Sequence, residues 1–323
     1  MRDNTKVRAL IRGVALVTGG AGFIGSHLAD ALTALDGVET VVVLDDLSSG
    51  SLANLEGCLR TGKLVFVNGD VRDRDLVGSL MERFSFDYVF HLAAKVSVAD
   101  SVRDPGGTES VNVGGTLSVL EASMEADVKR LVLASSCVIY GEAGRFPITK
   151  DEPPKPKSPY GISKLASEAY WLMFHELYGL KTVALRYFNV YGPRQKAGDY
   201  GGVVSAFISR ARSGLPPLIH GDGEQTRDFV YVSDVVRANL LAASRAGAIG
   251  TVFNIGSGKE TSINELANLI LELIGRPDLE PEHDAARPGD IRRSWADISR
   301  ARSTLGYEPK VSLREGLEEL LHL

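Results

Sequence analysis

The chain has 323 residues, of which 44% are hydrophobic and 24% are charged, an ordinary balance for a globular protein. Its formal net charge of −5, with acidic and basic residues mixed along the chain, excludes a nucleic-acid face and a polybasic membrane patch. The apolar runs are far shorter than the roughly 20 residues of a membrane span. With two cysteines, six scattered histidines and no N-terminal apolar signal segment, we expect a soluble cytoplasmic protein without a metal site.

Short β-branched runs alternate with helical stretches through the first part of the chain. The expected strands cover residues 14–17, 40–44, 64–67, 87–92, 131–134 and 182–185. A glycine-rich turn follows the first strand and leads into a helix expected over 26–35. Runs that are apolar on both faces and separated by helices indicate a parallel sheet covered on both sides. We therefore predict an α/β fold with a doubly wound parallel sheet of the Rossmann type.

The alternation of strands and helices changes after residue 189, where a glycine-rich loop interrupts it. Beyond it the sequence predicts a helix over 207–212, a returning strand over 252–255 and two helices that open with capping boxes, Ser262 with Glu265 and Ser312 with Glu315. We predict a dinucleotide-binding domain over 1–188 plus about 226–258. A smaller C-terminal α/β substrate lobe would comprise about 189–225 plus 259–323.

The glycine-rich turn, TGGAGFIG over 18–25, has the spacing of a dinucleotide-binding loop. Glycines permit a tight turn and a close approach of the backbone to a pyrophosphate at the helix N-terminus. Asp45 stands twenty residues beyond Gly25, at the end of the second expected strand. A carboxylate there can accept hydrogen bonds from ribose hydroxyls and repels a 2′-phosphate, which favours NAD over NADP. A plain tight turn is the competing interpretation.

Asp70 ends the third expected strand, in the stretch NGDV. It can bind the adenine amino group of a dinucleotide. It can equally cap the next helix, because Asp is a good N-cap residue. The residues alone leave both roles open.

Tyr160 and Lys164 are four residues apart in a stretch expected to be helical, so their side chains share one face. A tyrosine titrates near 10 and needs a pKa about three units lower to act as a base near neutrality. A neighbouring ammonium and a cationic nicotinamide ring both favour the phenolate. Ser136, at the carboxyl end of the fifth strand, can bridge Tyr160 to a substrate oxygen. Such a Tyr–Lys pair also occurs by chance on protein surfaces.

These motifs together resemble the NAD-dependent nucleotide-sugar epimerases of the extended short-chain dehydrogenase/reductase family. The resemblance covers nearly the whole chain in order, through TGGAGFIGSHL (18–28), LDDLSSG (44–50), GDV (69–71), HLAA (91–94), NVGGT (112–116), SSCVIYG (135–141), YGISK (160–164), RYFNVYGPR (186–194), GDGEQTRDFVYVSD (221–234) and RPGDIRRSWAD (287–297).

The resemblance implies a role for each matching residue. The catalytic residues are Ser136, Tyr160 and Lys164. The NAD-contacting residues are Gly19, Gly22, Phe23, Ile24, Gly25, Asp45, Asp46, Ser49, Gly50, Asp70, Val71, Leu92, Ala93, Ala94, Asn112, Tyr160, Lys164 and Tyr187. The substrate-contacting residues are Ser97, Ser136, Tyr160, Asn189, Val203, Leu218, His220, Arg227, Arg287, Asp290 and Ser294. For Arg227 and Arg287 the competing interpretation is an exposed ion pair.

Two departures from related enzymes narrow the predicted reaction. Cys137 and Val138 stand where related sugar 4,6-dehydratases carry an acidic pair, and neither can supply the acid and base for eliminating water. The Glu found in this stretch of related decarboxylases is absent too. Ser294 stands where many hexose 4-epimerases carry a bulky Tyr, which implies room for N-acetylhexosamines. A Ser that simply faces solvent is the competing interpretation.

The resemblance therefore implies NAD-dependent epimerisation at C4 of a UDP-sugar, through a transient 4-keto intermediate. The alternatives are a UDP-glucuronate 4-epimerase, another NAD-dependent nucleotide-sugar epimerase, or a non-catalytic NAD-binding scaffold. Family members are homodimers through the helix after Asn112 and the helix that carries Tyr160. Apolar Trp171, Leu172 and Phe174 are consistent with that interface, or equally with the core.

Overall fold

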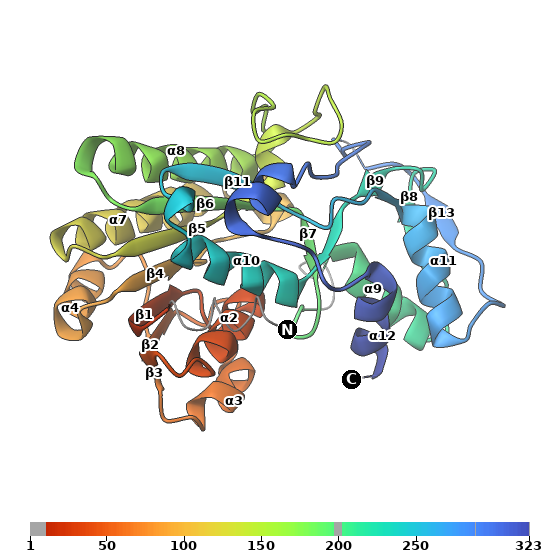
Figure 1. Ribbon diagram of the computed structural model, residues 1–323. Coiled ribbons are helices and arrows are strands. Elements are labelled where there is room, and N and C mark those ends of the chain that lie inside the picture. The colour runs from red at the N-terminus through yellow and green to blue at the C-terminus, as the bar shows by residue number, and fades with distance from the viewer. Residues whose placement is uncertain (1–10, 197–201, 288, 323) are drawn as a thin grey trace.

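A seven-stranded parallel sheet is the centre of the computed structural model, which describes residues 11–196, 202–287 and 289–322 (Figure 1). The strand order is β11-β6-β5-β4-β1-β2-β3. The strands are β1 Gly13–Thr18, β2 Val38–Asp45, β3 Leu64–Asn68, β4 Tyr88–His91, β5 Arg130–Ser136, β6 Thr182–Tyr187 and β11 Thr251–Ile255. The chain runs outward from β1 to β3 and then returns to β4 on the other side of β1. Ligands of such sheets bind at this reversal, outside the carboxyl ends of β1 and β4.

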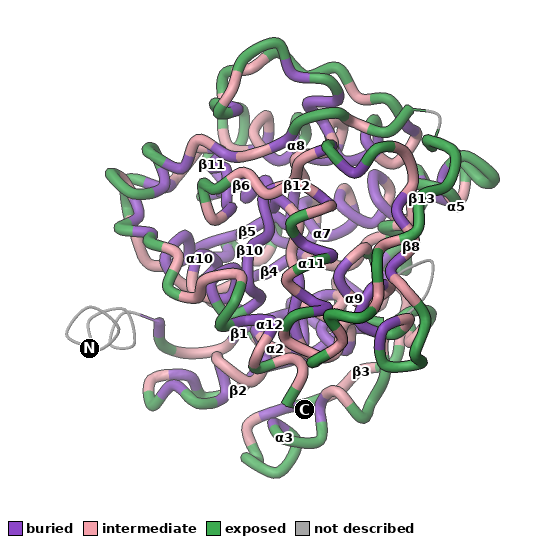
Figure 2. Tube along the Cα trace, turned by 90° about the vertical axis from the view of Figure 1, so that its right-hand side faces the viewer, coloured by how far each residue is buried: buried purple, intermediate pink, exposed green. Residues whose placement is uncertain are grey.

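Helices cover both faces of the sheet, and each face has its own apolar core. One core contains side chains of α2 Phe23–Thr33 and α10 Val232–Ser244. The other contains side chains of α4 Arg74–Phe84, α7 Gly115–Glu125 and α8 Pro159–Tyr178. In Figure 2, burial is concentrated along the strands and the inward faces of these helices. The predicted doubly wound α/β fold is confirmed.

A third apolar cluster lies in the part of the chain that follows β6. Its elements are β7 Asn189–Tyr191, α9 Gly202–Arg212, β8 Leu218–His220, β9 Thr226–Arg227, β10 Phe229–Tyr231, β12 Thr261–Ser262, α11 Ile263–Ile274, β13 Glu282–Asp284 and α12 Leu313–His322. Its strands form three two-stranded sheets, β10-β7, β12-β9 and β13-β8. In Figure 1 this part lies beyond the carboxyl ends of the main strands, and α9, α11 and α12 pack together there. The predicted domain boundaries stay a prediction.

The remaining short α-helices are α3 Glu56–Leu59, α5 Val98–Arg103 and α6 Pro105–Glu109. Short 3-10 helices cover η1 Leu52–Leu55, η3 Cys137–Tyr140 and η4 Ala246–Ala248, and π-helical turns cover η2 Ser110–Gly114 and η5 Ala301–Leu305. Among the described residues, no helix combines the length and the apolar character that crossing a membrane requires.

Most predicted elements are found at their predicted places, with shifted ends. The first helix begins at Phe23 rather than Ser26, because Gly22 in the glycine loop is already its N-cap. The capping box of Ser262 with Glu265 is present, and Gly275 ends that helix in the left-handed conformation. Trp171 and Phe174 are buried in the core beneath α8, so neither supports the predicted dimer. The dimer itself stays a prediction.

Candidate active site

The glycine loop between β1 and α2 is packed too closely to hold side chains. Gly19 has a φ of +68°, and a Cβ atom there would stand 2.7 Å from the backbone nitrogen of Ala93. A Cβ on Gly25 would stand 2.2 Å from the carbonyl oxygen of Gly19. Only glycine fits these two positions, because real Cβ atoms do not approach backbone atoms so closely. The loop therefore lies flat against the start of the segment that follows β4.

The N-terminus of α2 has no side-chain cap, and it follows the carboxyl end of β1, where the strand order of the sheet reverses. Its N-cap residue, Gly22, provides no side-chain hydrogen bond, and no acidic residue lies in the first turn. The first backbone N–H groups of a helix lack partners within the helix, and they attract anions together with the helix dipole. A pyrophosphate fits this end of α2, next to Phe23 and Ile24.

Asp45 is buried at the end of β2 and contacts the glycine loop directly. Its Oδ2 accepts a hydrogen bond from the backbone nitrogen of Ala21 at 2.9 Å, and its Oδ1 accepts one from Leu47 at 2.8 Å. Burial raises the pKa of this carboxyl group, while the two backbone hydrogen bonds oppose that rise. Each carboxylate oxygen keeps a free lone pair for a ribose hydroxyl. Loop, helix end and carboxylate together fit NAD.

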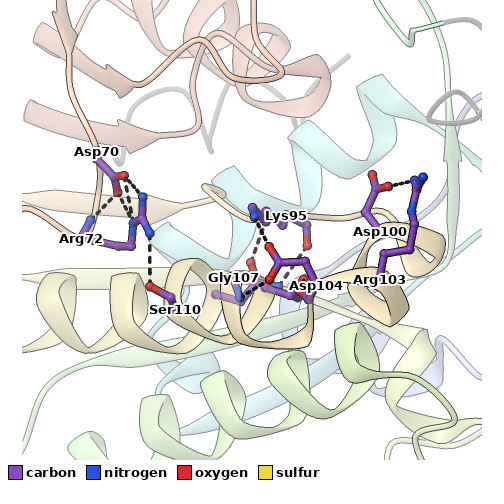
Figure 3. Close-up of polar contacts among 10 residues, drawn as sticks. Asp70, Arg72, Lys95, Asp100, Arg103, Asp104, Gly107 and Ser110 are labelled. Carbon is purple, nitrogen blue, oxygen red and sulfur yellow. Dashed lines mark hydrogen bonds and ion pairs between the residues drawn. The ribbon is translucent and has the colours of Figure 1, made fainter.

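Asp70 forms a two-pronged ion pair with Arg72, as Figure 3 shows. The Arg72 side chain lowers the pKa of Asp70, and Arg72 also donates a hydrogen bond to the Ser110 hydroxyl at 3.2 Å. The proposed capping role of Asp70 is wrong, because Asp73 caps α4 through the backbone nitrogen of Leu76. The adenine contact of Asp70 stays a prediction.

Ser136, Tyr160 and Lys164 come together at the carboxyl end of β5. Ser136 is the last residue of β5, and Tyr160 and Lys164 lie in the first turns of α8. The Tyr160 phenol is hydrogen-bonded to the Ser136 side chain. The Lys164 ammonium donates a hydrogen bond to the Ala134 carbonyl oxygen at 2.8 Å. The structure thus brings together all three residues predicted to be catalytic.

Burial dominates the protonation of this triad. It raises the pKa of Tyr160 to about 12, although the hydrogen bond to Ser136 opposes the rise. It lowers the pKa of Lys164 to about 8. Desolvation of the phenolate therefore outweighs the contact with Ser136, and the lowered tyrosine pKa expected from the sequence is not produced by these surroundings alone.

Asn112 joins the segment after β4 to α8. Its side chain exchanges two hydrogen bonds with the backbone of Lys95, at 2.8 and 3.0 Å, and donates a third to the Ser163 hydroxyl at 2.8 Å. The residues Leu92, Ala93 and Ala94 lead into this connection. The structure gives the Asn112 side chain a positioning role beside the predicted cofactor crevice.

Tyr187 ends β6, and its hydroxyl donates a hydrogen bond to Asn239 of α10 at 2.9 Å. Burial raises the pKa of this phenol above its usual value. The hydroxyl is therefore engaged inside the core, and the predicted cofactor contact of Tyr187 gains no support from it.

Arg227 lies at the end of β9 and forms an ion pair with Asp290 at 2.5 Å. Its side chain is only 15% exposed and also donates to the carbonyl oxygens of Thr226 and Ile291. The ion pair considered for Arg227 is therefore present, with the arginine side chain partly buried and Asp290 exposed, and the diphosphate contact of Arg227 stays a prediction. Arg287 is exposed, and its carbonyl oxygen accepts a hydrogen bond from the backbone nitrogen of Asp290 at 3.1 Å, which links two of the residues predicted to contact the substrate.

Ser294 is buried and forms a hydrogen bond with the Cys137 thiol, next to Ser136. The solvent-facing alternative for Ser294 is wrong. Burial raises the pKa of Cys137 to about 12, so this thiol stays protonated at neutral pH. A small side chain thus lies where the C-terminal segment meets the end of β5.

The other residues predicted to contact ligands lie at several places around this crevice. Ser97 caps α5 through the backbone nitrogen of Asp100 at 3.1 Å. The rest occupy the β2–α3 connection, the β3–α4 turn, β7, α9 and β8; they are Asp46, Ser49, Gly50, Val71, Asn189, Val203, Leu218 and His220. Their ligand contacts stay predictions.

Asp228 is a buried carboxylate that the sequence analysis missed. It accepts hydrogen bonds from the backbone nitrogens of Ser257, Gly258 and Ala296 at 2.6, 3.0 and 3.0 Å. Burial raises its pKa, and these bonds oppose the rise. Asp228 holds the segment with Ser294 in place. The sequence signal that could have identified Asp228 is its position directly before the apolar run FVYV.

The chain is similar to known proteins over most of its length. The model of the "NAD dependent epimerase/dehydratase family" matches residues 15–256. The UDP-glucose 4-epimerase of Mycolicibacterium smegmatis is 46% identical over 303 residues, which cover 94% of this chain and 95% of that protein.

Two solved structures are similar over nearly their whole length. A UDP-glucose 4-epimerase from Thermotoga maritima, crystallised with UDP-glucose, is 44% identical with a TM-score of 0.90, covering 96% of this chain and 97% of that one. A UDP-N-acetylglucosamine 4-epimerase from Methanobrevibacter ruminantium, in complex with UDP-N-acetylmuramic acid, is 38% identical with a TM-score of 0.90 and the same coverage.

These similarities confirm the predicted family resemblance and the fold. They also confirm NAD as the cofactor and the prediction that the chain is an NAD-dependent enzyme. The fit of the glycine loop, the α2 N-terminus and Asp45 to a dinucleotide agrees with this result. The chain belongs to the NAD-dependent epimerase/dehydratase family.

Proposed function

We propose that the protein epimerises a UDP-sugar at C4 through a transient 4-keto sugar. The observation that carries this proposal is the meeting of Ser136, Tyr160 and Lys164 at the end of β5, across the sheet's reversal point from the glycine loop. The names of the similar enzymes support the same reaction class. The chemistry that bound NAD supplies is reversible acceptance of hydride from the sugar C4.

Tyr160 acts as the base that takes the proton of the sugar 4-hydroxyl, and Ser136 positions that hydroxyl through its bond to Tyr160. Because burial raises the pKa of Tyr160 to about 12, the phenolate forms only when positive charge stands beside it. Lys164, anchored on the Ala134 carbonyl oxygen, holds an ammonium near this point. Arg227 and Arg287 bind the diphosphate by charge-assisted hydrogen bonds while the keto sugar turns over.

Dehydration is disfavoured at this site. Cys137 and Val138 follow Ser136, and burial raises the pKa of the thiol to about 12, so Cys137 supplies neither a base nor a readily released proton near neutral pH. Oxidation and reduction at a single carbon remain, which is the chemistry of an epimerase.

We propose UDP-glucose and UDP-galactose as substrates, together with their N-acetylated counterparts. The small, buried Ser294 beside Cys137 supports the second pair, because its side chain leaves more space than a tyrosine at this position. UDP-glucuronate is the alternative substrate, and its carboxylate needs a cationic contact. Lys95 and Arg194 form ion pairs with Asp104 and Asp30, as Arg227 does with Asp290, so these pairs do not separate the two kinds of substrate and the turnover panel below does.

A turnover panel tests the proposal. The NAD-loaded protein is incubated with UDP-glucose, UDP-galactose and their N-acetyl and uronate counterparts, and the C4 epimers are followed by NMR. We expect interconversion of the hexoses and N-acetylhexosamines. Preference for UDP-glucuronate, or full turnover by a Tyr160→Phe variant that still binds NAD, would overturn the assignment. A protein that binds NAD and converts none of the sugars would be a scaffold.

A further inference from the structure

Ser135 and Glu168 form a buried contact that the proposed mechanism does not use. The Ser135 hydroxyl donates a hydrogen bond to Oε2 of Glu168 at 2.7 Å, and both residues are 3% exposed. Ser135 precedes Ser136 on β5, and Glu168 lies one helical turn beyond Lys164 on α8. The contact therefore joins the strand and the helix that carry the catalytic residues.

Three successive residues of β5 are each bound by a residue of one face of α8. The pairs are Ala134 with Lys164, Ser135 with Glu168, and Ser136 with Tyr160. The helix residues are spaced by four, which places them along one side of the helix. This row of contacts determines how far α8 can slide or turn relative to the end of β5.

Glu168 is itself held firmly from the other side. Arg186 of β6 donates to Oε2 of Glu168 at 2.9 Å and to Oε1 at 2.5 Å. Burial alone would lower the pKa of Arg186, but the bonds and charge of Glu168 raise it overall. A bidentate, buried pair of this kind fixes the orientation of the carboxylate as well as its position.

Arg186 is anchored beyond Glu168 as well. It donates a hydrogen bond to the Tyr140 hydroxyl at 2.6 Å and to the Lys150 carbonyl oxygen at 2.8 Å. The Tyr140 hydroxyl in turn donates to Asn254 of β11 at 2.6 Å. The network thus spans β5, α8, β6 and β11, and Ser135 is its attachment to the catalytic strand.

We propose that Glu168, acting through Ser135, is a positioning residue that holds α8 in the register in which Tyr160 meets Ser136. This inference rests on the proposed function. Misplacing reacting groups by about 1 Å can cost about 100-fold in rate, and side chains locked by a buried supporting network keep such geometry. The Ser135 bond therefore contributes to the rate of the chemical step, beyond its contribution to stability.

Two single-hydroxyl deletions separate this role from a structural one. Ser135→Ala removes the link between β5 and α8, whereas Tyr140→Phe removes a buried hydroxyl from the far end of the same network. In the NAD-loaded enzyme we expect Ser135→Ala to lower kcat about 10-fold, with KM changed less than about twofold. The isotope effect with C4-deuterated UDP-glucose should rise, because hydride transfer becomes slower. Tyr140→Phe should lower Tm and leave kcat and the isotope effect unchanged, because Glu168 keeps its bidentate pair with Arg186 and its bond to Ser135.

Glu168→Gln is the second variant, because it weakens the same contact from the helix side and leaves β5 intact. A lower kcat with a larger isotope effect in this variant supports the proposal. Equal losses of Tm in Ser135→Ala and Tyr140→Phe, with kcat and the isotope effect unchanged in both, would overturn it. So would wild-type kcat in a folded Glu168→Gln variant. Failure of the wild-type protein to convert any UDP-hexose refutes the proposed function instead, and is recognised before any variant is compared.

Discussion

Replacing Lys164 with Met should abolish turnover without reducing the stability of the NAD-free protein at pH 7. Lys164 is only 6% exposed, and burial lowers its pKa from 10.5 to about 8. Holding a charged ammonium in this place therefore opposes folding at neutral pH. Met has a similar length and volume and carries no charge to desolvate.

The magnitude follows from the two pKa values. Their difference corresponds to about 3 kcal/mol of destabilisation while the lysine is charged, at pH values below 8. Losing the hydrogen bond to the Ala134 carbonyl oxygen costs about 2 kcal/mol, because the donor is charged. The variant should therefore be as stable as the wild type at pH 7, or more stable by about 1 kcal/mol.

The sign of the pH dependence makes the test specific. Between pH 8 and 10.5 the unfolded chain keeps the lysine proton and the folded protein has lost it, so wild-type stability rises with pH. The slope approaches about 1.4 kcal/mol per pH unit. Lys164→Met lacks this contribution, so the stability difference between the two proteins should shift steadily toward the wild type in that range.

Urea unfolding of both NAD-free proteins from pH 7 to 10 measures this difference. Lys63→Met is the matched control, because Lys63 also donates to a backbone carbonyl oxygen, that of Leu35, at 2.8 Å but is half-buried. The control isolates the loss of such a bond. A Lys164→Met protein that is less stable than the wild type by more than about 2 kcal/mol at pH 7, or a difference that does not change with pH, would refute the reasoning.

Three further predictions concern the loop, the core and the pocket. Gly25→Ala should weaken NAD binding, measured by calorimetry, more than 10-fold, because its Cβ would stand 2.2 Å from the Gly19 carbonyl oxygen. Gly78→Ala is the control, since Gly78 lies on α4 with open space around it, and it should leave NAD binding unchanged. Equal NAD affinities of the two variants would contradict the prediction. Burial lowers the pKa of His91 to about 3, so its contribution to stability is lost as pH falls from 6.5. Wild-type unfolding should therefore be steeper in pH than that of His91→Gln, by about 1.4 kcal/mol per unit between pH 4 and 6, and parallel curves would contradict this. Ser294→Tyr should lower kcat/KM for N-acetylhexosamines more than for hexoses, and a uniform loss would show that Ser294 does not border the C2 substituent.

Much of the sheet, and the shared helix of the catalytic candidates Tyr160 and Lys164, could be predicted from sequence because their signals are local. Apolar runs marked the strands, and the glycine spacing marked the turn before α2. The spacing of Ser262 and Glu265 marked a helix start, since both partners of a capping box lie within four residues. Tyr160 and Lys164 were placed on one face by helical periodicity alone.

Local signals failed at the start of α4, where Asp70 was the candidate cap and Asp73 is the actual one. Asp70 and Asp73 both precede α4, and only the geometry showed that Asp73 caps it while Asp70 pairs with Arg72. The sequence likewise left open whether Trp171 lies in the core or in a dimer interface, because an apolar residue on a helix suits both equally well. In each case the deciding information is which way the side chain points, and that depends on packing against distant elements.

The sequence by itself therefore determined the order of elements, the dinucleotide loop and which residues are the catalytic candidates. Only the tertiary structure decided what surrounds them. Glu168 accepts a hydrogen bond from Ser135, 33 residues away in the sequence, and Asp228 accepts one from Ala296, 68 residues away. No periodicity reports contacts at such separations, because they exist only after the sheet has brought the strand ends together. The same packing buries Tyr160 and Lys164, so it moves their pKa values in directions that the residue types alone do not reveal.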